Sequence, residues 1–188
     1  MTAPTFSTGL SAILIGGASL TIACGDILLA GGHHVTAVVT RNTDVAAWAR
    51  HHHLSVLERV TDLCDGAHKA DWLLSVAHLE LIPPEVLALP EKGAINFHDG
   101  PLPQYAGLNT PAWAIMNQKP SHGVSWHMID GKVDAGDVLV QRDIDMVPDE
   151  AAVSLNSKCY AAGVESFSDL LKQLETGVLD RRAQDLDK

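Results

Sequence analysis

Residues 94–109 read AINFHDGPLPQYAGLN, a short apolar run that passes directly into a loop rich in proline and glycine. Apolar runs of this length that end in turn residues are typical of buried strands in parallel sheets. On a strand, residues two apart point to the same face, so we expect the side chains of Asn96 and His98 to project together. Open α/β sheets bind ligands at the carboxyl ends of their strands. The stretch therefore predicts a parallel sheet with a site at its edge.

On the amino-terminal side of this stretch, strand and helix signals alternate. Short apolar runs are followed by helical stretches, and Gly31 and Gly32 end the first helix. This order predicts an α/β fold with a Rossmann-like, mostly parallel sheet and helices on both faces. The expected strands are 12–15, 35–39, 54–57, 72–77 and 94–97, and the expected helices are 19–30, 44–52 and 83–87.

On the carboxyl-terminal side the pattern changes. Two apolar runs are joined so closely that we expect antiparallel strands there. A long amphipathic helix follows and ends at Gly177. The expected elements are a helix over 109–117, strands over 124–128 and 138–145, and a helix over 150–175.

The length and charge of the chain limit its organisation and its partners. A chain of 188 residues has the size of one ordinary domain. We predict one domain over residues 1–177, followed by a polar tail or linker over residues 178–188. The 23 acidic and 13 basic residues give a net charge of −10, which argues against a nucleic-acid partner and against a basic membrane anchor.

Cysteine usage and hydropathy predict a location. The three cysteines are far apart and form no paired motif, which disfavours disulfides and zinc knuckles and is typical of a reducing compartment. No apolar run reaches the roughly 18 residues of a membrane span. The first residues, Met1–Pro4, lack the basic region of a signal peptide. We therefore expect a cytoplasmic protein that does not enter a membrane.

Two further polar segments, His122–His127 and Asp134–Asp137, follow the opening stretch. An amide, an imidazole and a carboxylate together suit acyl transfer to an amine. The amide donates to a developing oxyanion, the imidazole donates or relays a proton, and the carboxylate accepts one. An Asn-x-His pattern on a strand, such as Asn96 and His98, is by itself more often a hydrogen-bonded structural pair than a catalytic one. The Asp134–Asp137 segment by itself is a common type of loop between strands.

Two other patterns are weaker indications of a cofactor or metal site. The Gly16–Gly17 turn does not match the glycine spacing of a dinucleotide-binding loop. The tract His51–His53 lies at a predicted helix end, where consecutive side chains point in different directions. We therefore expect neither a nicotinamide cofactor nor a metal site.

Taken in order, the motifs resemble the catalytic domain of the folate-dependent formyltransferases, as found in methionyl-tRNA formyltransferase. The variant Asn-Phe-His-Asp-Gly-Pro-Leu-Pro over residues 96–103 is most similar to the formyltransferase domains of nonribosomal peptide synthetases. The family pattern is Asn-x-His, Leu-Pro, an aromatic residue, a glycine, His-Gly-Val and Asp-x-Gly. It is matched by residues 96–98, 102–103, Tyr105, Gly107, 122–124 and 134–136.

This resemblance implies roles for individual residues. Asn96 and His98 would stabilise the tetrahedral intermediate, and Asp134 would orient His98 and remove the proton of the attacking amine. The formyl donor would be 10-formyltetrahydrofolate, and no metal would be needed. The pterin would lie against Val76, Ala77, His78, Leu79, Glu80, Leu81, Asp130, Gly131, Lys132 and Val133. The amine substrate would be contacted by Asp99, Gly100, Gly107 and Asn109.

The resemblance also implies an acceptor. It favours an aminoacyl group on a carrier protein, at the start of a nonribosomal peptide pathway and possibly within a larger synthetase. The alternatives are a small-molecule amine such as a sugar or glycinamide substrate, a formyltetrahydrofolate hydrolase, or a non-catalytic domain of the same fold. Nothing in the sequence names the acceptor or gives the oligomeric state.

Overall fold

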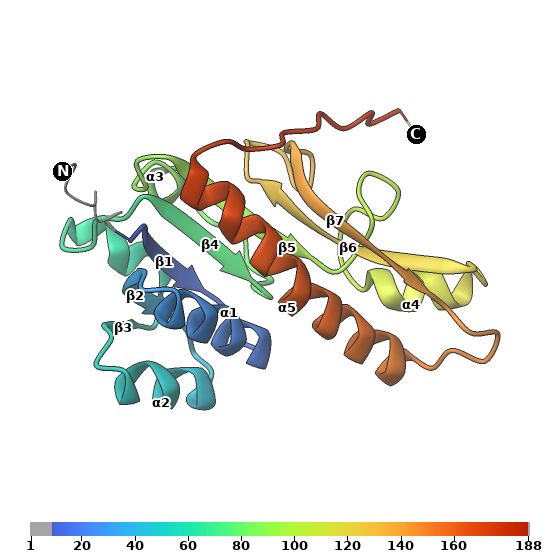
Figure 1. The fold of residues 1–188 in the computed structure, drawn as a ribbon, viewed down its shortest axis with the longest axis horizontal. Helices are drawn as coiled ribbons and strands as arrows, with labels where there is room; N and C mark the ends of the chain where they lie inside the picture. Colours follow the sequence, from blue (N-terminus) through green and yellow to red (C-terminus); the bar gives the residue numbers. More distant parts are fainter. Residues whose placement is uncertain (1–8, 188) are drawn as a thin grey trace, which may run out of the picture.

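A computed structural model describes residues 9–187. Seven strands form one sheet in the order β3-β2-β1-β4-β5-β6-β7, in which the first five strands are parallel and the last two antiparallel (Figure 1). The strands are β1 (Ser11–Ile15), β2 (His34–Val39), β3 (Val56–Leu57), β4 (Trp72–Val76), β5 (Gly93–His98), β6 (Ser121–Met128) and β7 (Val138–Asp145). The helices are α1 (Ser19–Ala30), α2 (Thr43–His51), a 3-10 helix η1 (Val60–Asp65), α3 (Pro84–Leu87), α4 (Thr110–Met116) and α5 (Ala152–Thr176).

Helices cover both faces of the sheet, as predicted. Alternate residues of each central strand point to opposite faces, so Leu14 and Ile13 belong to two separate apolar clusters. One cluster is completed by α1 and α5. The other is completed by Leu63 of η1 and Val86 of α3.

The long helix α5 crosses the sheet beside β6 and β7 (Figure 1). Its Phe167 ring packs 5.2 Å from the ring of Trp126 on β6, and Trp126 packs 5.0 Å from Phe97 on β5. The indole Nε1 of Trp126 donates to Ser166 Oγ at 2.9 Å. Because both polar partners are buried, this bond satisfies them and fixes the helix on the sheet.

Two boundaries differ from the predicted ones in ways that bear on the site. Strand β5 continues to His98, because this residue pairs with Ser125 on β6. Strand β6 begins at Ser121, three residues earlier than expected, because Ser121 pairs with Asp145 at the far end of β7. The 3-10 helix over Val60–Asp65 was not predicted at all.

The segment after α5 lies along the edge of the sheet. Arg182 exchanges two backbone hydrogen bonds with Val138 of β7, and Figure 1 shows the segment after α5 passing the ends of β6 and β7 at the top of the view. The domain limits stay a prediction, and residues 1–8 of the predicted domain and Lys188 of the tail lie outside the described residues. Among the helices that are described, none combines the length and the apolar character needed to cross a membrane.

Candidate active site

Three neighbouring strands place polar side chains in one row. Ser75, Asn96 and His127 are aligned across β4, β5 and β6. Ser75 Oγ donates to Asn96 Oδ1 at 2.8 Å, and Asn96 Nδ2 lies 3.2 Å from Nε2 of His127. These contacts fix the amide, so that its Nδ2 faces the imidazole. A primary amide has two N–H hydrogens, and the second one is available for a reacting oxygen.

The tautomer of His127 follows from its partners. Its Nδ1 lies 2.8 Å from the carbonyl oxygen of Met128, which only accepts, so Nδ1 donates. In the neutral ring Nε2 therefore accepts from the Asn96 amide. The Asp134 carboxylate oxygen Oδ1 lies 3.5 Å from the same Nε2, a position from which it stabilises the positive charge of a protonated ring.

His98 lies at the end of β5 on the same face as Asn96 and is almost fully buried. Its Nε2 donates to the carbonyl oxygen of Tyr105 at 2.5 Å, and its Nδ1 lies 3.7 Å from Oδ2 of Asp134. With Nε2 committed to the loop, Nδ1 is the atom that faces the carboxylate. It can donate to a ligand only in the protonated ring.

Asp134 joins the row from the loop between β6 and β7. Its φ angle is 51°, in the left-handed region that few residues other than glycine adopt. Its Oδ2 accepts the backbone N–H of Gly107 at 2.8 Å. Burial opposes ionisation of this carboxyl, but the contact with His127, the charge of His98 and the Gly107 amide outweigh it and hold its pKa below the ordinary value. Asp134 is therefore a carboxylate at neutral pH.

The loop after β5 is held by a buried hydroxyl. Ser125 Oγ donates to the carbonyl of Gly100 at 2.8 Å and accepts from the backbone N–H of Leu102 at 3.2 Å and from Gln141 Nε2 at 2.9 Å. Gly100 must lack a side chain, because a Cβ atom there would lie 2.8 Å from Nε2 of His98. The loop thus closes tightly over His98.

The residues predicted to contact the amine separate into two groups. Gly100 and Gly107 adjoin His98 and Asp134 as described, and Asn109 is exposed at the start of α4 with a φ angle of 60°. Asp99 follows His98 by one residue, and its carboxylate lies on the α5 side of the sheet. There Thr110 Oγ1 donates to Asp99 Oδ1 at 3.2 Å. Burial raises the pKa of the Cys159 thiol on α5 to about 12, and the negative charge of Asp99 adds to this shift.

The two segments predicted to hold the pterin border one face of the sheet. Ile82 and Ile129, which adjoin segments 76–81 and 130–133, pack against the same buried cluster. His78 is half-buried, and its Nε2 is buried without a hydrogen-bond partner among the described residues. Leu79 and Leu81 expose more than three quarters of their surface. These segments therefore offer one buried hydrogen-bonding atom and exposed apolar area.

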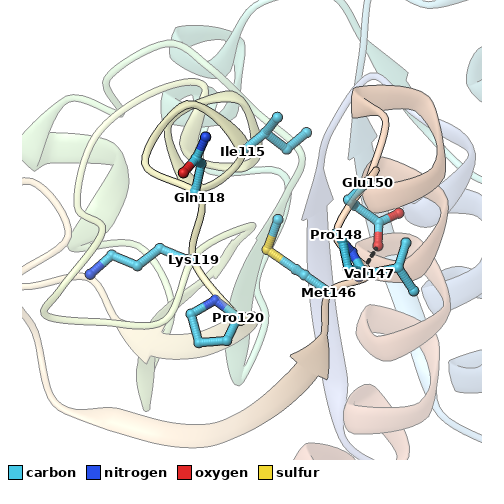
Figure 2. A pocket seen from close by; sticks show the side chains of 8 residues that line it. All are labelled: Ile115, Gln118, Lys119, Pro120, Met146, Val147, Pro148 and Glu150. Carbon is cyan, nitrogen blue, oxygen red and sulfur yellow. Dashed lines mark hydrogen bonds between the residues drawn. The ribbon is translucent and has the colours of Figure 1, made fainter.

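A separate cavity of about 510 Å³ lies between the end of α4 and the connection from β7 to α5 (Figure 2). Its walls include Ile115, Lys119, Met146 and Glu150. Lys158 and Ser154 donate hydrogen bonds to the Glu150 carboxylate and lower its pKa to about 2. None of the predicted site residues lines this cavity.

Sequence reasoning assigned no individual role to Ser75, His127 or Gln141, although His127 ends one of the polar segments noted above. Their positions depend on pairing between strands, which a single strand does not reveal. For His127 a signal was present, because it lies two residues after Ser125 and therefore shares its face of β6.

Comparisons with known proteins agree with this fold and site. A family model described as formyl transferase matches residues 34–171. The methionyl-tRNA formyltransferase of Geobacter sulfurreducens is 32% identical over 176 residues, which cover 84% of this chain and 56% of that protein. The corresponding protein of Geobacter metallireducens is 35% identical over 115 residues, 61% of this chain and 37% of that one. This chain thus spans about half or less of these curated relatives.

Two solved structures share the fold. Glycinamide ribonucleotide transformylase 1 from Symbiobacterium toebii superposes with a TM-score of 0.83 at 16% identity, covering 98% of this chain and 97% of that one. A formyltetrahydrofolate deformylase from Pseudomonas syringae pv. tomato gives 0.81 at 14% identity, covering 94% of this chain and 65% of that one. The family model extends over Asn96, His98 and Asp134. The chain therefore belongs to the folate-dependent formyltransferase family.

Proposed function

We propose that this chain transfers a formyl group from 10-formyltetrahydrofolate to a primary amine, with Asn96, His98 and Asp134 as its catalytic residues. The proposal depends on one observation. The Asp134 carboxylate lies within 3.7 Å of Nδ1 of His98, beside the Asn96 amide, at the carboxyl end of a parallel strand. Membership of the formyltransferase family supports the reaction class.

The proposed reaction follows from the atoms present. The folate supplies the formyl carbon, and its N10 is the leaving group. Asn96 Nδ2 and the protonated Nδ1 of His98 donate to the formyl oxygen, which becomes negative when the amine attacks the carbon. Asp134 accepts the proton that the amine loses as the new C–N bond forms. Asp134 then returns that proton to N10 as the N10–C bond breaks, and the products are a formamide and tetrahydrofolate.

The donor site is proposed at segments 76–81 and 130–133. The Nε2 atom of His78 is buried and has no hydrogen-bond partner within residues 9–187, so it offers one polar contact, and the exposed Leu79 and Leu81 offer apolar area. The chain's cysteines that lie in the described part, Cys24, Cys64 and Cys159, are all free thiols. This supports the further proposal that the protein works in a reducing compartment such as the cytoplasm.

For the acceptor, we propose an aminoacyl group on a carrier protein. The resemblance of residues 96–103 to synthetase-linked formyltransferase domains supports it. A second observation is the exposed apolar surface next to the site, where Leu108, Trp113 and Met116 lie on and before α4. This surface would suit a macromolecular acceptor better than a small soluble amine, which needs no contact area outside the site.

The test compares acceptors with the donor held constant. Release of tetrahydrofolate is followed with an aminoacyl-loaded carrier, with the unloaded carrier, with free amino acids and amino sugars, and with no acceptor. A mass gain of one formyl group on the loaded carrier alone supports the proposal. Transfer to a small amine instead overturns the carrier assignment, and donor cleavage without any acceptor indicates a hydrolase. Donor binding without turnover in every mixture would indicate a non-catalytic domain.

A further inference from the structure

The segment that follows α5 holds the loop that carries Asp134, and we propose that Gln184 is the positioning residue for the Asp134 carboxylate. Gln184 does not touch the predicted reacting atoms. It acts through the backbone of residues 134–136. The inference rests on the proposed function, in which Asp134 accepts the proton of the amine.

Gln184 binds the loop at two points. Its Nε2 donates to the carbonyl oxygen of Asp134 at 2.9 Å and to that of Gly136 at 2.6 Å. These two carbonyls flank the turn that begins with the left-handed Asp134, whose φ angle is 51°. A residue other than glycine persists in this region only when its surroundings hold it there. One side-chain amide thus satisfies both carbonyls of the turn and supports its unusual backbone.

Gln184 is itself held in place by the residues that precede it. Arg182 forms two backbone hydrogen bonds with Val138, of 2.8 and 2.9 Å, and Arg181 Nε donates to Asp137 Oδ2 at 2.9 Å. Figure 1 shows this segment running over the ends of β6 and β7. The tail is therefore an ordered strap, joined to the first residue of β7 immediately after the loop.

The strap is also tied to α5. The Gln173 side chain accepts the backbone N–H of Asp180 at 2.8 Å and donates to the carbonyl of Leu139 at 3.2 Å. The path from the helix to Gln184 is consequently short and anchored at each step. Movement of the tail would change where Gln184 can place its amide.

The carboxylate responds to the backbone that Gln184 supports. Asp134 contacts the Gly107 amide and faces His98 from β5 and His127 from β6. The Asp137–Arg181 pair lies beside the loop, and Asp130 lies on its other arm. If the two donors of Gln184 are lost, the turn can relax and the carboxylate leaves these partners. Its pKa then moves up from the lowered value it has in the native site.

The experiment uses Gln184→Met in the full chain, because methionine has a similar size and no N–H donor. Leu186→Ala, at an exposed position in the same segment, is the matched control. We measure kcat, the KM for the formyl donor, thermal unfolding, and the pH titration of the Asp134 carboxyl by ¹³C NMR, assigned with Asp134→Asn. For Gln184→Met we expect kcat to fall roughly 10- to 100-fold, since a misplacement of about 1 Å can cost about 100-fold in rate. The KM should stay unchanged and the Asp134 titration should move to higher pH.

Each outcome tests either the positioning role of Gln184 or the catalytic role proposed for Asp134. If Gln184→Met has the kcat and the Asp134 titration of the native protein, the inference is overturned. A fall in kcat with an unchanged Asp134 titration also overturns it, since Gln184 would then have only a structural role. If Asp134→Asn is fully active, the catalytic role proposed for Asp134 fails, and with it the basis of this inference, whatever Gln184 does. If Asp134→Asn is inactive while Gln184→Met is normal, only the positioning role fails.

Discussion

The amide of Asn96 has its orientation set from two sides, by the hydroxyl of Ser75 and the imidazole of His127. In the proposed reaction this arrangement would need no reorganisation, because the amide is already held in one direction before charge develops on the formyl oxygen. Preorganised donors of this kind are among the largest single contributions to enzymatic rate. If Asn96 has the proposed role, its fixed direction contributes as much to that role as its amide chemistry.

Asn96→Ala removes this donor without adding bulk. We expect kcat for formyl transfer to fall roughly 100- to 1,000-fold, the usual cost of losing one oxyanion donor, while the donor still binds. The measurement is steady-state release of tetrahydrofolate, alongside donor binding by calorimetry. Asn156→Ala, at an exposed position on α5, serves as the control and should behave as the native protein. An Asn96→Ala protein with native kcat would contradict the mechanism.

The lowered pKa of the Asp134 carboxyl also predicts that the free energy of unfolding depends on pH. Its pKa in the folded protein is lowered from 3.8, so the carboxylate favours the folded state above pH 3.8 and this contribution is lost as the pH falls through the folded value. Asp134→Asn lacks the charge at every pH. The difference in free energy of unfolding between the two proteins should be constant near neutral pH and should shrink in acid. Denaturant titrations at a series of pH values measure it, and a difference that grows in acid would refute the assignment.

At the scale of single residues, sequence and structure agree unevenly. The order of the motifs places Asn96, His98 and Asp134 in one family pattern, and the structure brings their side chains together. Their catalytic roles remain predictions. Asp99 was expected to contact the amine, and this stays a prediction; in the structure its carboxylate accepts a hydrogen bond from Thr110 Oγ1 at 3.2 Å, on the α5 side of the sheet.

At the scale of elements, the loop after β5 depends on one hydroxyl from β6. Ser125 is fully buried and serves both a carbonyl and an N–H of the loop. Ser125→Ala leaves these groups without their partner, and a buried polar group left unpaired costs about 1–3 kcal/mol. Chemical denaturation should show a loss of this size.

Two further variants make the Ser125 prediction specific. Ser125→Thr keeps the hydroxyl and should lose less stability than Ser125→Ala. Ser157→Ala, on the exposed side of α5, removes only a bond to the carbonyl of Val153. It should change stability little. Equal losses in Ser125→Ala and Ser157→Ala would show that the loop does not depend on the buried hydroxyl.

The elements themselves were largely predictable, because their signals are local. The alternating apolar runs gave the parallel strands, and the short connection between 124–128 and 138–145 gave the antiparallel pair. The ends of the strands were not predictable in this way, because they depend on the register of pairing. The early start of β6 comes from its pairing with β7, and the length of β5 comes from the pairing of His98 with Ser125.

At the scale of the whole molecule, α5 joins parts of the chain that are distant in sequence. Its residues share one apolar cluster with Leu20 and Leu28 of α1 and with Trp126 of β6. The cluster therefore spans the parallel and the antiparallel parts of the sheet. We expect the two parts to unfold together.

Phe167→Ala tests this unity. The ring is completely buried against Trp126, and truncating a buried aromatic side chain costs about 3–5 kcal/mol. Unfolding is followed by circular dichroism and by tryptophan fluorescence. We expect both signals to shift together to lower denaturant concentration. If only the fluorescence transition shifted, the two parts of the sheet would be independent units.

The tail is the part of the molecule that composition describes least well. Its polar, charged residues are typical of a linker, and residues 178–188 were expected to be a tail or linker. Arg182 and Gln184 nevertheless bond to Val138 and to the Asp134 loop. These bonds involve backbone groups and one amide side chain, and such partners leave no hydrophobic pattern in the sequence.

The late position of α5 in the chain has a consequence for biosynthesis. The strands that it covers leave the ribosome before the helix does, so the apolar face around Trp126 stays exposed until α5 has been synthesised. At roughly 5–20 residues per second, synthesis of the 25 residues of α5 takes about 1–5 seconds. During that interval the nascent chain exposes the surface that chaperones recognise and that neighbouring chains can aggregate through. Slow translation of this helix would lengthen that period and lower the yield of folded protein.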